Sequence, residues 1–525
     1  MKKTIVALTG ASGAMGEEIL YSLMHKNEDV YVCAFLRSYK KATPYLKKLL
    51  KKYKERIYTF YGDVTNLEDC KKLVSNADYV IHCAAVIPPK CDHNPKLAEK
   101  VNLGGTINMV DAICQSPRKD DIKFIHVSTM ATYGNRTYPH VWGRVGDPMI
   151  SADYDVYSLY KIKAERYVLE SNLKNFISLR QTLVFHKYMF ANNLKDGLLF
   201  HTAWNSPFES VTDRDSGDLL ANLIERDSNG KLSDFWNKCY NVGGGENCRI
   251  TGFDTVNDGF ALLGKGAKDY FKPNWNVARN FAGVWFADSD VLEEKLNFRK
   301  ENNADFWTRM GKKYWYFKFG KIVPAKLISW AIFKPLFKNT NAPKYWYNHK
   351  KDGRIKAFYG GYAEYEKMGE NWNNFNLICE GKAPDGSVVD YKNLINLSWA
   401  TENGLLLNHG YDESKTDDKL SLEDMRTAAA FRGGKCLSTE YIAGDMRQKL
   451  KWQCYFGHEF YATPYTVLKG GYWCPCCEPK PWSYGKIAKH SPFYAQVYYD
   501  THDISEENDV YPLYEGEDDF IENLK

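Results

Sequence analysis

A tyrosine and a lysine four residues apart, Tyr157 and Lys161, have the types and the spacing needed for proton transfer. Residues four apart lie on one face of an α-helix, so the phenol and the ammonium can act at one place. A phenol has a reference pKa of about 10, and a neighbouring ammonium lowers that pKa by favouring the phenolate. The pair predicts a general acid/base, although an aromatic–lysine pair on an exposed helix has the same spacing. Tyr160 has no such partner in the sequence, because Ala164 stands four residues after it.

A glycine-rich turn near the start of the chain is the second chemical feature. The segment Thr9-Gly10-Ala11-Ser12-Gly13-Ala14-Met15-Gly16 follows the apolar run Thr4–Leu8 and precedes a predicted helix, Glu17–Met24. Glycines permit a tight turn, and a helix N-terminus offers free N–H groups and a positive dipole to a pyrophosphate. A plain strand–helix connection can have the same glycines. The position at the opening of a βαβ series favours dinucleotide binding.

The elements that must position these residues alternate along the first third of the chain. Amphipathic helical stretches separate six apolar, β-branched runs: Thr4–Leu8, Val30–Phe35, Arg56–Tyr61, Tyr79–Cys83, Lys123–Ser128 and Phe176–Gln181. Continuous apolar strands separated by helices indicate a parallel sheet covered on both faces. The sequence therefore predicts an α/β fold, with a Rossmann-type doubly wound sheet over residues 1–180 and a small substrate lobe over residues 181–300.

Over residues 4–300 the chain resembles the extended short-chain dehydrogenase/reductase family, which includes NAD-dependent epimerases and dehydratases. Besides the glycine turn, the similar segments are Gly62-Asp63-Val64-Thr65, His82-Cys83-Ala84-Ala85, Val101–Thr106 and Val127–Gly134. The resemblance implies that Thr129 orients the substrate oxygen beside Tyr157, with Ser128 as the neighbouring alternative. It implies a cofactor site formed by Gly10, Ser12, Gly13, Ala14, Met15, Gly16, Asp63, Val64, Cys83, Ala84, Ala85, Asn102 and Lys161.

The end of the second predicted strand indicates which nicotinamide cofactor is used. An acidic residue there would bond the ribose hydroxyls of NAD, whereas a basic residue favours the 2′-phosphate of NADP. This chain has Leu36-Arg37-Ser38-Tyr39-Lys40-Lys41 and no carboxylate. Arginine is the natural planar partner of a phosphate, so NADP is favoured over NAD, with Arg37 as its contact. The alternative is that these cations only begin an exposed basic helix that ends near Arg56.

Two departures from the family's pattern narrow the reaction. Nucleotide-sugar dehydratases carry Asp-Glu after the catalytic threonine, where this chain has Met130-Ala131. Nucleotide-sugar epimerases continue the sixth strand as Arg-x-x-Asn. At these positions this chain has Arg180-Gln181-Thr182-Leu183, without the asparagine. We therefore expect an NAD(P)-dependent oxidoreductase that transfers a hydride between nicotinamide and the alcohol or carbonyl carbon of a small molecule. The alternatives are an epimerase with tightly bound NAD and a non-catalytic dinucleotide-sensing regulator with a nucleic-acid-binding ribbon.

Large apolar side chains suggest the substrate class. A pocket for a sterol-like or terpenoid hydroxyl or ketone would be lined by Met130, Phe185, Met189, Phe190, Phe200, Trp204 and Phe208. Ligand pockets are lined mainly by such residues, but so are ordinary cores. Both interpretations stay open at the level of sequence.

Four soft metal ligands stand near the end of the chain. Cys454 and His458 form one pair, and Cys474 and Cys477 form a second pair fifteen residues later. Four protein ligands complete the tetrahedron of a structural zinc and leave no open catalytic position. Cys476 could replace Cys477, Cys436 is a further candidate, and a metal-free group of buried thiols would have the same spacing. We expect a zinc-ribbon-like module over residues 430–480.

The remaining segments are an aromatic and basic connecting region, residues 301–429, and a C-terminal tail, residues 481–525, acidic at its end. Within the former, Phe306–Lys351 interleaves aromatic residues with lysines. This pattern fits contact with a membrane surface or a packed helix with snorkelling lysines. The net charge of +5 is small for 525 residues and the ribbon is not strongly basic, so a nucleic-acid partner is not expected. A homo-oligomer is compatible with the sequence.

The thirteen cysteines stand mostly alone, which is typical of a reducing compartment. The apolar run after Met-Lys-Lys is too short for a signal peptide. A spanning helix needs roughly 18 uninterrupted apolar residues, and Ile322–Phe337 is broken by prolines and lysines. The expected location is the cytoplasm, with no transmembrane segment.

Overall fold

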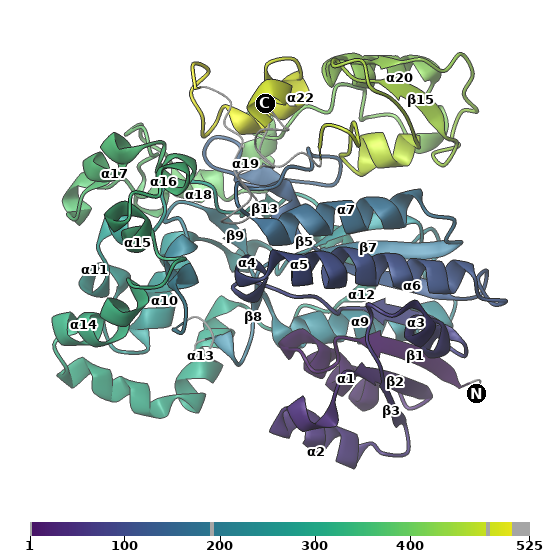
Figure 1. Ribbon diagram of the computed structural model, residues 1–525, viewed down its shortest axis with the longest axis horizontal. Helices are drawn as coiled ribbons and strands as arrows, with labels where there is room; N and C mark the ends of the chain where they lie inside the picture. The colour runs from purple at the N-terminus through teal and green to yellow at the C-terminus, as the bar shows by residue number, and fades with distance from the viewer. Residues whose placement is uncertain (1–2, 190–193, 479–483, 507–525) are drawn as a thin grey trace.

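The computed structural model describes residues 3–189, 194–478 and 484–506 (Figure 1). Phe190 and the acidic residues from Glu507 to the C-terminus lie outside these described ranges. The chain has an α/β half, a helical lobe and a smaller C-terminal unit, which Figure 1 shows at the centre, left and top.

A seven-stranded parallel sheet organises the first half of the chain, in the order β11-β7-β5-β4-β1-β2-β3. Its strands are β1 (Thr4–Thr9), β2 (Val30–Leu36), β3 (Ile57–Tyr61), β4 (Tyr79–His82), β5 (Lys123–Thr129), β7 (Asn175–Gln181) and β11 (Lys238–Val242). The direction of chain winding reverses between β1 and β4, and ligands of such sheets bind beyond the carboxyl ends of the strands at that point. The predicted doubly wound fold is confirmed.

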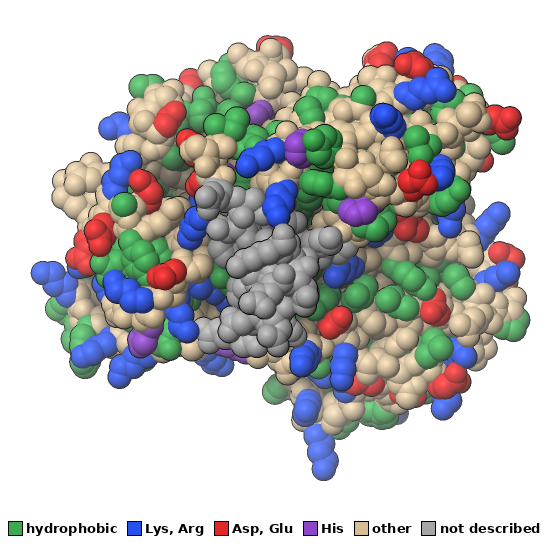
Figure 2. All heavy atoms as spheres, turned by 45° about the horizontal axis from the view of Figure 1, so that its top comes forward, with side chains coloured by type: hydrophobic (Ala, Val, Ile, Leu, Met, Phe, Trp, Pro, Cys, Tyr) green, Lys and Arg blue, Asp and Glu red, His purple; other side chains and the backbone are tan. Residues whose placement is uncertain are grey.

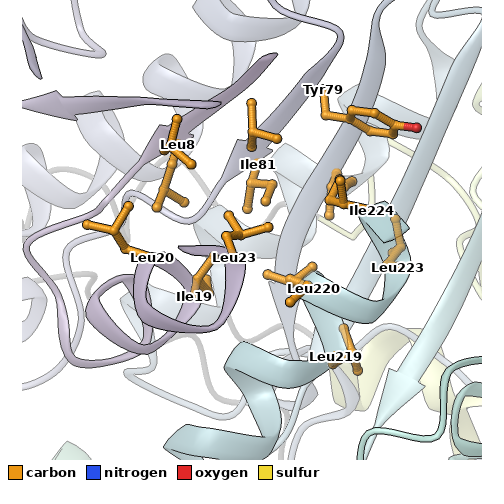
Figure 3. Packing of buried hydrophobic residues seen from close by; sticks show 14 of the residues in the cluster. Leu8, Ile19, Leu20, Leu23, Tyr79, Ile81, Leu219, Leu220, Leu223 and Ile224 are labelled. Carbon is orange, nitrogen blue, oxygen red and sulfur yellow. The ribbon is translucent and has the colours of Figure 1, made fainter. Parts of the chain in front are cut away.

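Helices cover both faces of this sheet. On one face α1 (Ala14–Lys26) packs on α9 (Asp213–Ser228), and Figure 3 shows Leu23, Leu220 and Ile224 converging with Leu8 and Ile81 of the strands. The other face is covered by α3 (Leu67–Val74), α6 (Gly105–Cys114) and α7 (Val156–Glu170). Strands buried on both faces are expected to be mainly apolar, as β1, β2 and β4 are. Shorter helices of this half are α2 (Pro44–Lys52), α4 (Lys90–His93), α5 (Pro95–Ala98) and α12 (Asp290–Leu296).

The substrate lobe is built from short strand pairs and many helices. The pairs are β8 (Val184–Phe185) with β10 (Val211–Thr212), β9 (Pro207–Glu209) with β12 (Arg249–Thr251), and β6 (Trp142–Gly143) with β13 (Trp285–Phe286). The helices are α10 (Gly252–Ala261), α11 (Ala267–Tyr270), α13 (Asn303–Lys313), α14 (Ala325–Leu336), α15 (Pro343–Asn348), α16 (Asp352–Tyr359), α17 (Tyr362–Met368), α18 (Tyr391–Leu394) and α19 (Leu397–Glu402).

A large part of residues 301–429 packs into this lobe. Phe333, Trp346 and Phe358 from that region share one hydrophobic core with Phe200 and Trp204. Aromatic burial of this kind is a large contribution to core energetics. The end of the region, from Leu407 on, contributes instead to the core of the C-terminal unit.

The C-terminal unit contains a three-stranded antiparallel sheet, β14 (Lys435–Cys436), β15 (Leu450–Gln453) and β16 (Glu459–Ala462). It is flanked by α20 (Leu422–Phe431), α21 (Tyr484–Ala488) and α22 (Pro492–Tyr498). Its core extends from Leu407 to Val497 and includes Ile150 from the first half of the chain. The unit is thus larger than residues 430–480 and packs against the α/β half.

Charged side chains of both signs are interspersed over the face drawn in Figure 2. None of the thirteen cysteines, all of which lie in the described ranges, forms a disulfide. Across the described ranges, no helix combines the length and the apolar character needed to cross a membrane.

Candidate active site and metal cluster

A pocket of about 200 Å³ lies beyond the carboxyl ends of β1, β2, β3 and β4. Among the residues predicted to hold a dinucleotide, those that line it are Gly10, Ser12, Gly13, Arg37, Asp63, Val64, Cys83, Ala84 and Ala85. Phe35, Gly62, Val86 and Val101 complete the lining. The pocket therefore lies at the switch point of the sheet, between β1 and β4.

The glycine turn leaves no space for larger residues. Gly10 has a φ of +72°, and a Cβ on it would lie 2.7 Å from the backbone carbon of Cys83. A Cβ on Gly16 would lie 2.1 Å from the carbonyl oxygen of Gly10. Helix α1 begins at Ala14 without a side-chain cap, so N–H groups of its first turn are available to an anion. These features fit a bound pyrophosphate.

Asn102 contacts the backbone of Val86, one of the residues that line this pocket. It is buried, its Oδ1 accepts from the Val86 N–H (2.7 Å), and its Nδ2 donates to the Val86 carbonyl (2.9 Å). On the other side, Thr9 Oγ1 accepts from the N–H groups of Cys83 and Ala84, both at 3.1 Å. Asn102, like Ala14, Met15, Gly16 and Lys161, is not among the lining residues. The contacts of Asn102 position the Cys83–Val86 segment.

Tyr157 lies in the first turn of α7, next to Thr129 at the end of β5. The Asp155 carboxylate caps the helix by accepting from the Ser158 N–H (3.0 Å), which places Tyr157 at that turn. Tyr157 is half-buried, and its phenol lies near the Thr129 hydroxyl. Burial raises the pKa of Tyr157, and the nearby Thr129 hydroxyl opposes part of this rise. Ser128 lies instead beside Glu165, because successive side chains of a strand point to opposite faces.

Lys161 lies one helical turn after Tyr157 and is 3% exposed. Its Nζ donates to the Val127 carbonyl (2.6 Å) and lies 3.4 Å from Nε2 of His126. Burial lowers the pKa of Lys161 to about 8. The ammonium is thus held against β5, and its expected action on the phenol stays a prediction.

A buried row of polar residues crosses the sheet beneath Lys161, and the sequence analysis missed it. Thr9, His82, His126 and Ser178 are register partners on β1, β4, β5 and β7. His82 Nδ1 lies 3.0 Å from Thr9 Oγ1, and His126 Nδ1 lies 3.1 Å from Ser178 Oγ. Burial lowers the pKa of both histidines, to about 3 for His82. The only signal in the sequence was a histidine in each of two otherwise apolar strands.

An apolar cavity of about 210 Å³ lies in the substrate lobe. It is lined by Leu183, Met189, Leu194, Leu198, Leu199, Thr202, Phe208, Thr255, Val256, Gly259, Phe260, Phe281 and Trp307. Phe208 belongs to the apolar cluster against which Leu183, Phe281 and Tyr157 pack. The cavity lining and the tyrosine thus share one hydrophobic cluster.

Of the residues predicted to form an apolar pocket wall, two line this cavity and four do not. Met189 and Phe208 line the cavity, whereas four others are core residues: Met130, Phe185, Phe200 and Trp204. The ring of Phe200 packs on Phe333 and that of Trp204 on Trp372, at centroid distances of 5.7 and 5.0 Å. Partners far along the chain thus cover these rings.

The predicted metal ligands converge in the C-terminal unit. Cys454, His458, Cys474 and Cys477 place their ligand atoms within 4.8 Å of one another. The Sγ atoms of Cys454 and Cys477 are 3.8 Å apart, and His458 Nδ1 lies 3.4 and 3.3 Å from them. Tetrahedral zinc with Zn–S bonds of about 2.3 Å requires ligand atoms roughly 3.5–3.8 Å apart. Of the alternatives, Cys476 is exposed, and neither it nor Cys436 belongs to the cluster.

Residues around the second cysteine pair bind directly to α7. Arg166 of α7 donates to the Trp473 carbonyl (2.9 Å) and to the Glu478 carboxylate (2.8 Å). Tyr472 donates to the Ile162 carbonyl (3.1 Å). The Arg166–Glu478 pair is largely buried, so breaking it would leave an uncompensated charge. The Cys/His cluster is therefore flanked by residues that contact the helix carrying Tyr157 and Lys161.

Comparison with known proteins agrees with this geometry. Residues 6–201 match the NAD dependent epimerase/dehydratase family. Human 3 beta-hydroxysteroid dehydrogenase type 7 is 28% identical over 174 residues, which are 33% of this chain and 45% of that protein. A Methanocaldococcus jannaschii protein named as an uncharacterized membrane protein is 31% identical over 129 residues, 24% of this chain and 37% of its own. The matched region is thus less than half of either relative.

Solved structures of nucleotide-sugar enzymes also align with part of the chain. The UDP-glucuronic acid 4-epimerase of Bacillus cereus, in complex with UDP-glucuronic acid and NAD, is 18% identical with a TM-score of 0.47, covering 60% of this chain and 99% of its own. The dTDP-glucose 4,6-dehydratase of Streptomyces venezuelae is 15% identical with a TM-score of 0.47, at 60% and 97% coverage. The sheet order of the first half of the chain is that of a doubly wound, Rossmann-type fold, and most of residues 6–201, which match the family model, lie in this half.

Proposed function

We propose that this chain is an NAD(P)-dependent oxidoreductase, with NADP favoured, that interconverts an apolar alcohol and its ketone. The observation that carries the proposal is that Tyr157 has neighbours among the lining residues of both pockets. Cys83, from the dinucleotide pocket, is close enough to raise the pKa of the phenol. Phe208, from the apolar cavity, belongs to the cluster against which the same tyrosine packs.

The residues of this chain would handle the proton, while bound nicotinamide supplies or accepts the hydride. In the reductive direction Tyr157 donates its phenolic proton to the carbonyl oxygen, and in the oxidative direction the phenolate takes that proton back. The raised pKa keeps the phenol protonated and ready to act as the acid. Thr129 orients the substrate oxygen, and the Lys161 ammonium favours the phenolate that the reaction leaves.

The lining of the cavity supports an apolar substrate. Its polar side chains are those of Thr202 and Thr255, and no charged side chain contributes to the lining among the residues the structure describes. A nucleotide sugar carries a diphosphate, which proteins bind with arginine, lysine or clustered N–H groups. Leu183, which stands where epimerases of the family have an asparagine, lines the cavity as well. These features favour a hydroxysteroid-like or terpenoid alcohol over a sugar nucleotide.

A substrate panel tests the proposal. Purified protein is mixed with NADPH or NADH and with sterol-like ketones, terpenoid ketones or UDP-hexoses, and the absorbance at about 340 nm is followed. We expect net oxidation of the cofactor with the apolar ketones only. Conversion of a UDP-hexose to its epimer without net change in absorbance would contradict the proposal.

The cofactor preference has its own test at Arg37. Arg37→Asp removes a phosphate partner and adds a repelling carboxylate, so we expect the Kd for NADP to rise at least about tenfold more than the Kd for NAD. Titration calorimetry with both cofactors measures the two changes. Lys40→Asp is the matched control, because this exposed cation lies three residues further on and outside the pocket lining. An unchanged ratio of the two Kd values in the Arg37 variant would refute the assignment of NADP.

We also propose that Cys454, His458, Cys474 and Cys477 bind one structural zinc. The distances between their ligand atoms and the soft character of three thiolates support zinc over a hard cation. Four protein ligands leave no position for substrate or water. Through the contacts of Arg166 and Tyr472, the metal would stabilise the position of α7.

A further inference from the structure

One exposed face of the substrate lobe combines large apolar side chains with lysines. It comprises the 3₁₀ helix η7 (Trp315–Ile322), the helix α14 that follows it and the lysines beside them. Six of its side chains are at least 50% exposed, namely Trp315, Tyr316, Phe319, Ile322, Leu327 and Trp330. Elsewhere in the described ranges, large exposed hydrophobic residues stand singly or in twos along the chain. Monomeric soluble proteins rarely gather so many at one place without an interaction there. We call residues 312–338 the aromatic–lysine face.

The opposite side of α14 is fixed to the lobe, so the aromatic–lysine face points to solvent. The Ser329 hydroxyl on α14 donates to the Tyr270 carbonyl of α11 (2.8 Å), and Phe333 and Leu336 are buried in the lobe core. The exposed positions of α14 repeat every four residues, at 326–327, 330–331 and 334–335, and so form one side of the helix. Figure 1 places α13 and α14 at the lower left edge of the molecule, far from the C-terminal unit at the top.

The charge of this segment has a single sign. Between Phe306 and Lys351 the sequence contains no aspartate or glutamate. The lysines of the face stand at 312, 313, 318, 321, 326, 334 and 338. Lys318 lies over the rings of Trp315 and Phe319, both at 5.6 Å, and Lys334 lies over Trp330 at 5.4 Å. Lysines in this arrangement cover apolar surface with their stems and keep the ammonium in water.

We propose that the aromatic–lysine face docks on the surface of an anionic lipid bilayer. Tryptophan and tyrosine favour the boundary between acyl chains and headgroups, and lysines are attracted to anionic headgroups. The aliphatic side chains of the face favour a lipid bilayer over a nucleic acid as its partner. Ile322 is 82% and Leu327 is 53% exposed, and neither offers a ring on which a base could stack. Transfer of both side chains from water into the apolar part of a bilayer is favourable in free energy.

The apolar cavity lies directly behind this face. Trp307, in the helix that precedes η7, lines the cavity, and so does Phe260, whose ring packs on Phe333 of α14 at 5.8 Å. Docking would bring the cavity wall to the bilayer in which an apolar alcohol dissolves. This last step rests on the proposed function, whereas docking itself does not.

Sedimentation of the full chain with vesicles tests the proposal without any nicotinamide or substrate. The vesicles are phosphatidylcholine alone or phosphatidylcholine with phosphatidylserine. We expect binding to the anionic vesicles that is at least about tenfold stronger than to the neutral ones and that weakens with salt. The variant Ile322→Ser/Leu327→Ser/Trp330→Ser should lose at least about tenfold in affinity, because the apolar contribution disappears while every lysine remains. All three side chains are exposed, so the fold should be retained.

The matched control is Tyr58→Ser/Val388→Ser/Tyr461→Ser, which removes equally exposed side chains from other parts of the surface. It should bind vesicles as the wild type does. The proposal is overturned if the wild type does not sediment with anionic vesicles, or if both triple variants bind equally well. It is also overturned if binding to single-stranded RNA, measured in parallel, is stronger than vesicle binding and equally weakened by the Ile322 variant. Loss of oxidoreductase activity alone would leave these sedimentation results unchanged, so the two proposals fail separately.

Discussion

Tyr157→Phe is expected to lower kcat by about 100-fold or more, because it removes the proton donor and leaves the ring in place. The phenol lies outside the lining of the dinucleotide pocket, so the Kd for the cofactor should stay within about twofold of the wild type. Steady-state turnover of an apolar ketone and titration of NADPH measure the two quantities.

Tyr167→Phe is the matched control for this substitution. Tyr167 lies on the same helix, is 36% exposed, and donates to Asp111. It should keep nearly full activity. A folded Tyr157→Phe protein that retains at least half of the wild-type kcat would show that the phenol is not the general acid/base.

Loss of the proposed zinc site is expected to lower the thermal stability of the protein, and this is the second largest of the expected effects. Purified protein should contain one zinc per chain, and Cys474→Ser should lose it because a tetrahedral site with three ligands binds much more weakly. Metal binding of this kind contributes directly to folding, so the Tm of the variant should fall by about 5 °C or more. Amide exchange should increase in residues 430–480 and in α7, where Arg166 and Tyr472 make their contacts.

Cys476→Ser is the control for the metal site, since its side chain is exposed and outside the cluster. It should retain both the zinc and the Tm. Elemental analysis decides the point independently of activity. A well-folded wild-type preparation without metal and with the same Tm would show that the four residues form no zinc site.

The sequence predicts the central sheet well because its strands are encoded locally. Runs such as Val30–Phe35 and Tyr79–Cys83 are mainly apolar, and the six predicted strands differ from the observed ones by one residue at most at either end. The seventh strand, β11, was not predicted. Asn241 interrupts its apolar pattern, and this side chain accepts from the Tyr133 hydroxyl and donates to Asp288. Its burial depends on partners that a local pattern does not contain.

The candidate site also has features that local sequence patterns predict and features that depend on long-range packing. The glycine turn, the Tyr157–Lys161 spacing and the four Cys/His residues are short-range patterns. In the structure, residues of the glycine turn line one pocket, the four Cys/His ligand atoms form one cluster, and Tyr157 and Lys161 lie one turn apart on α7. The wall of the substrate pocket is not short-range, because Phe200 is covered by Phe333 from a distant helix. The histidine row beneath Lys161 likewise exists only through strand register. The positions of Phe200 and of the histidine row thus depend on long-range packing, which a local sequence pattern does not contain.

The most direct measurement of the central claim follows a labelled hydride. NADPH carrying deuterium at the transferable position is incubated with the protein and an apolar ketone, and the product alcohol is analysed by mass spectrometry. The proposed function predicts one deuterium on the carbinol carbon of every product molecule, formed in step with NADP and absent with Tyr157→Phe. A product without deuterium, or NADPH that stays unconsumed while substrate is converted, would contradict it.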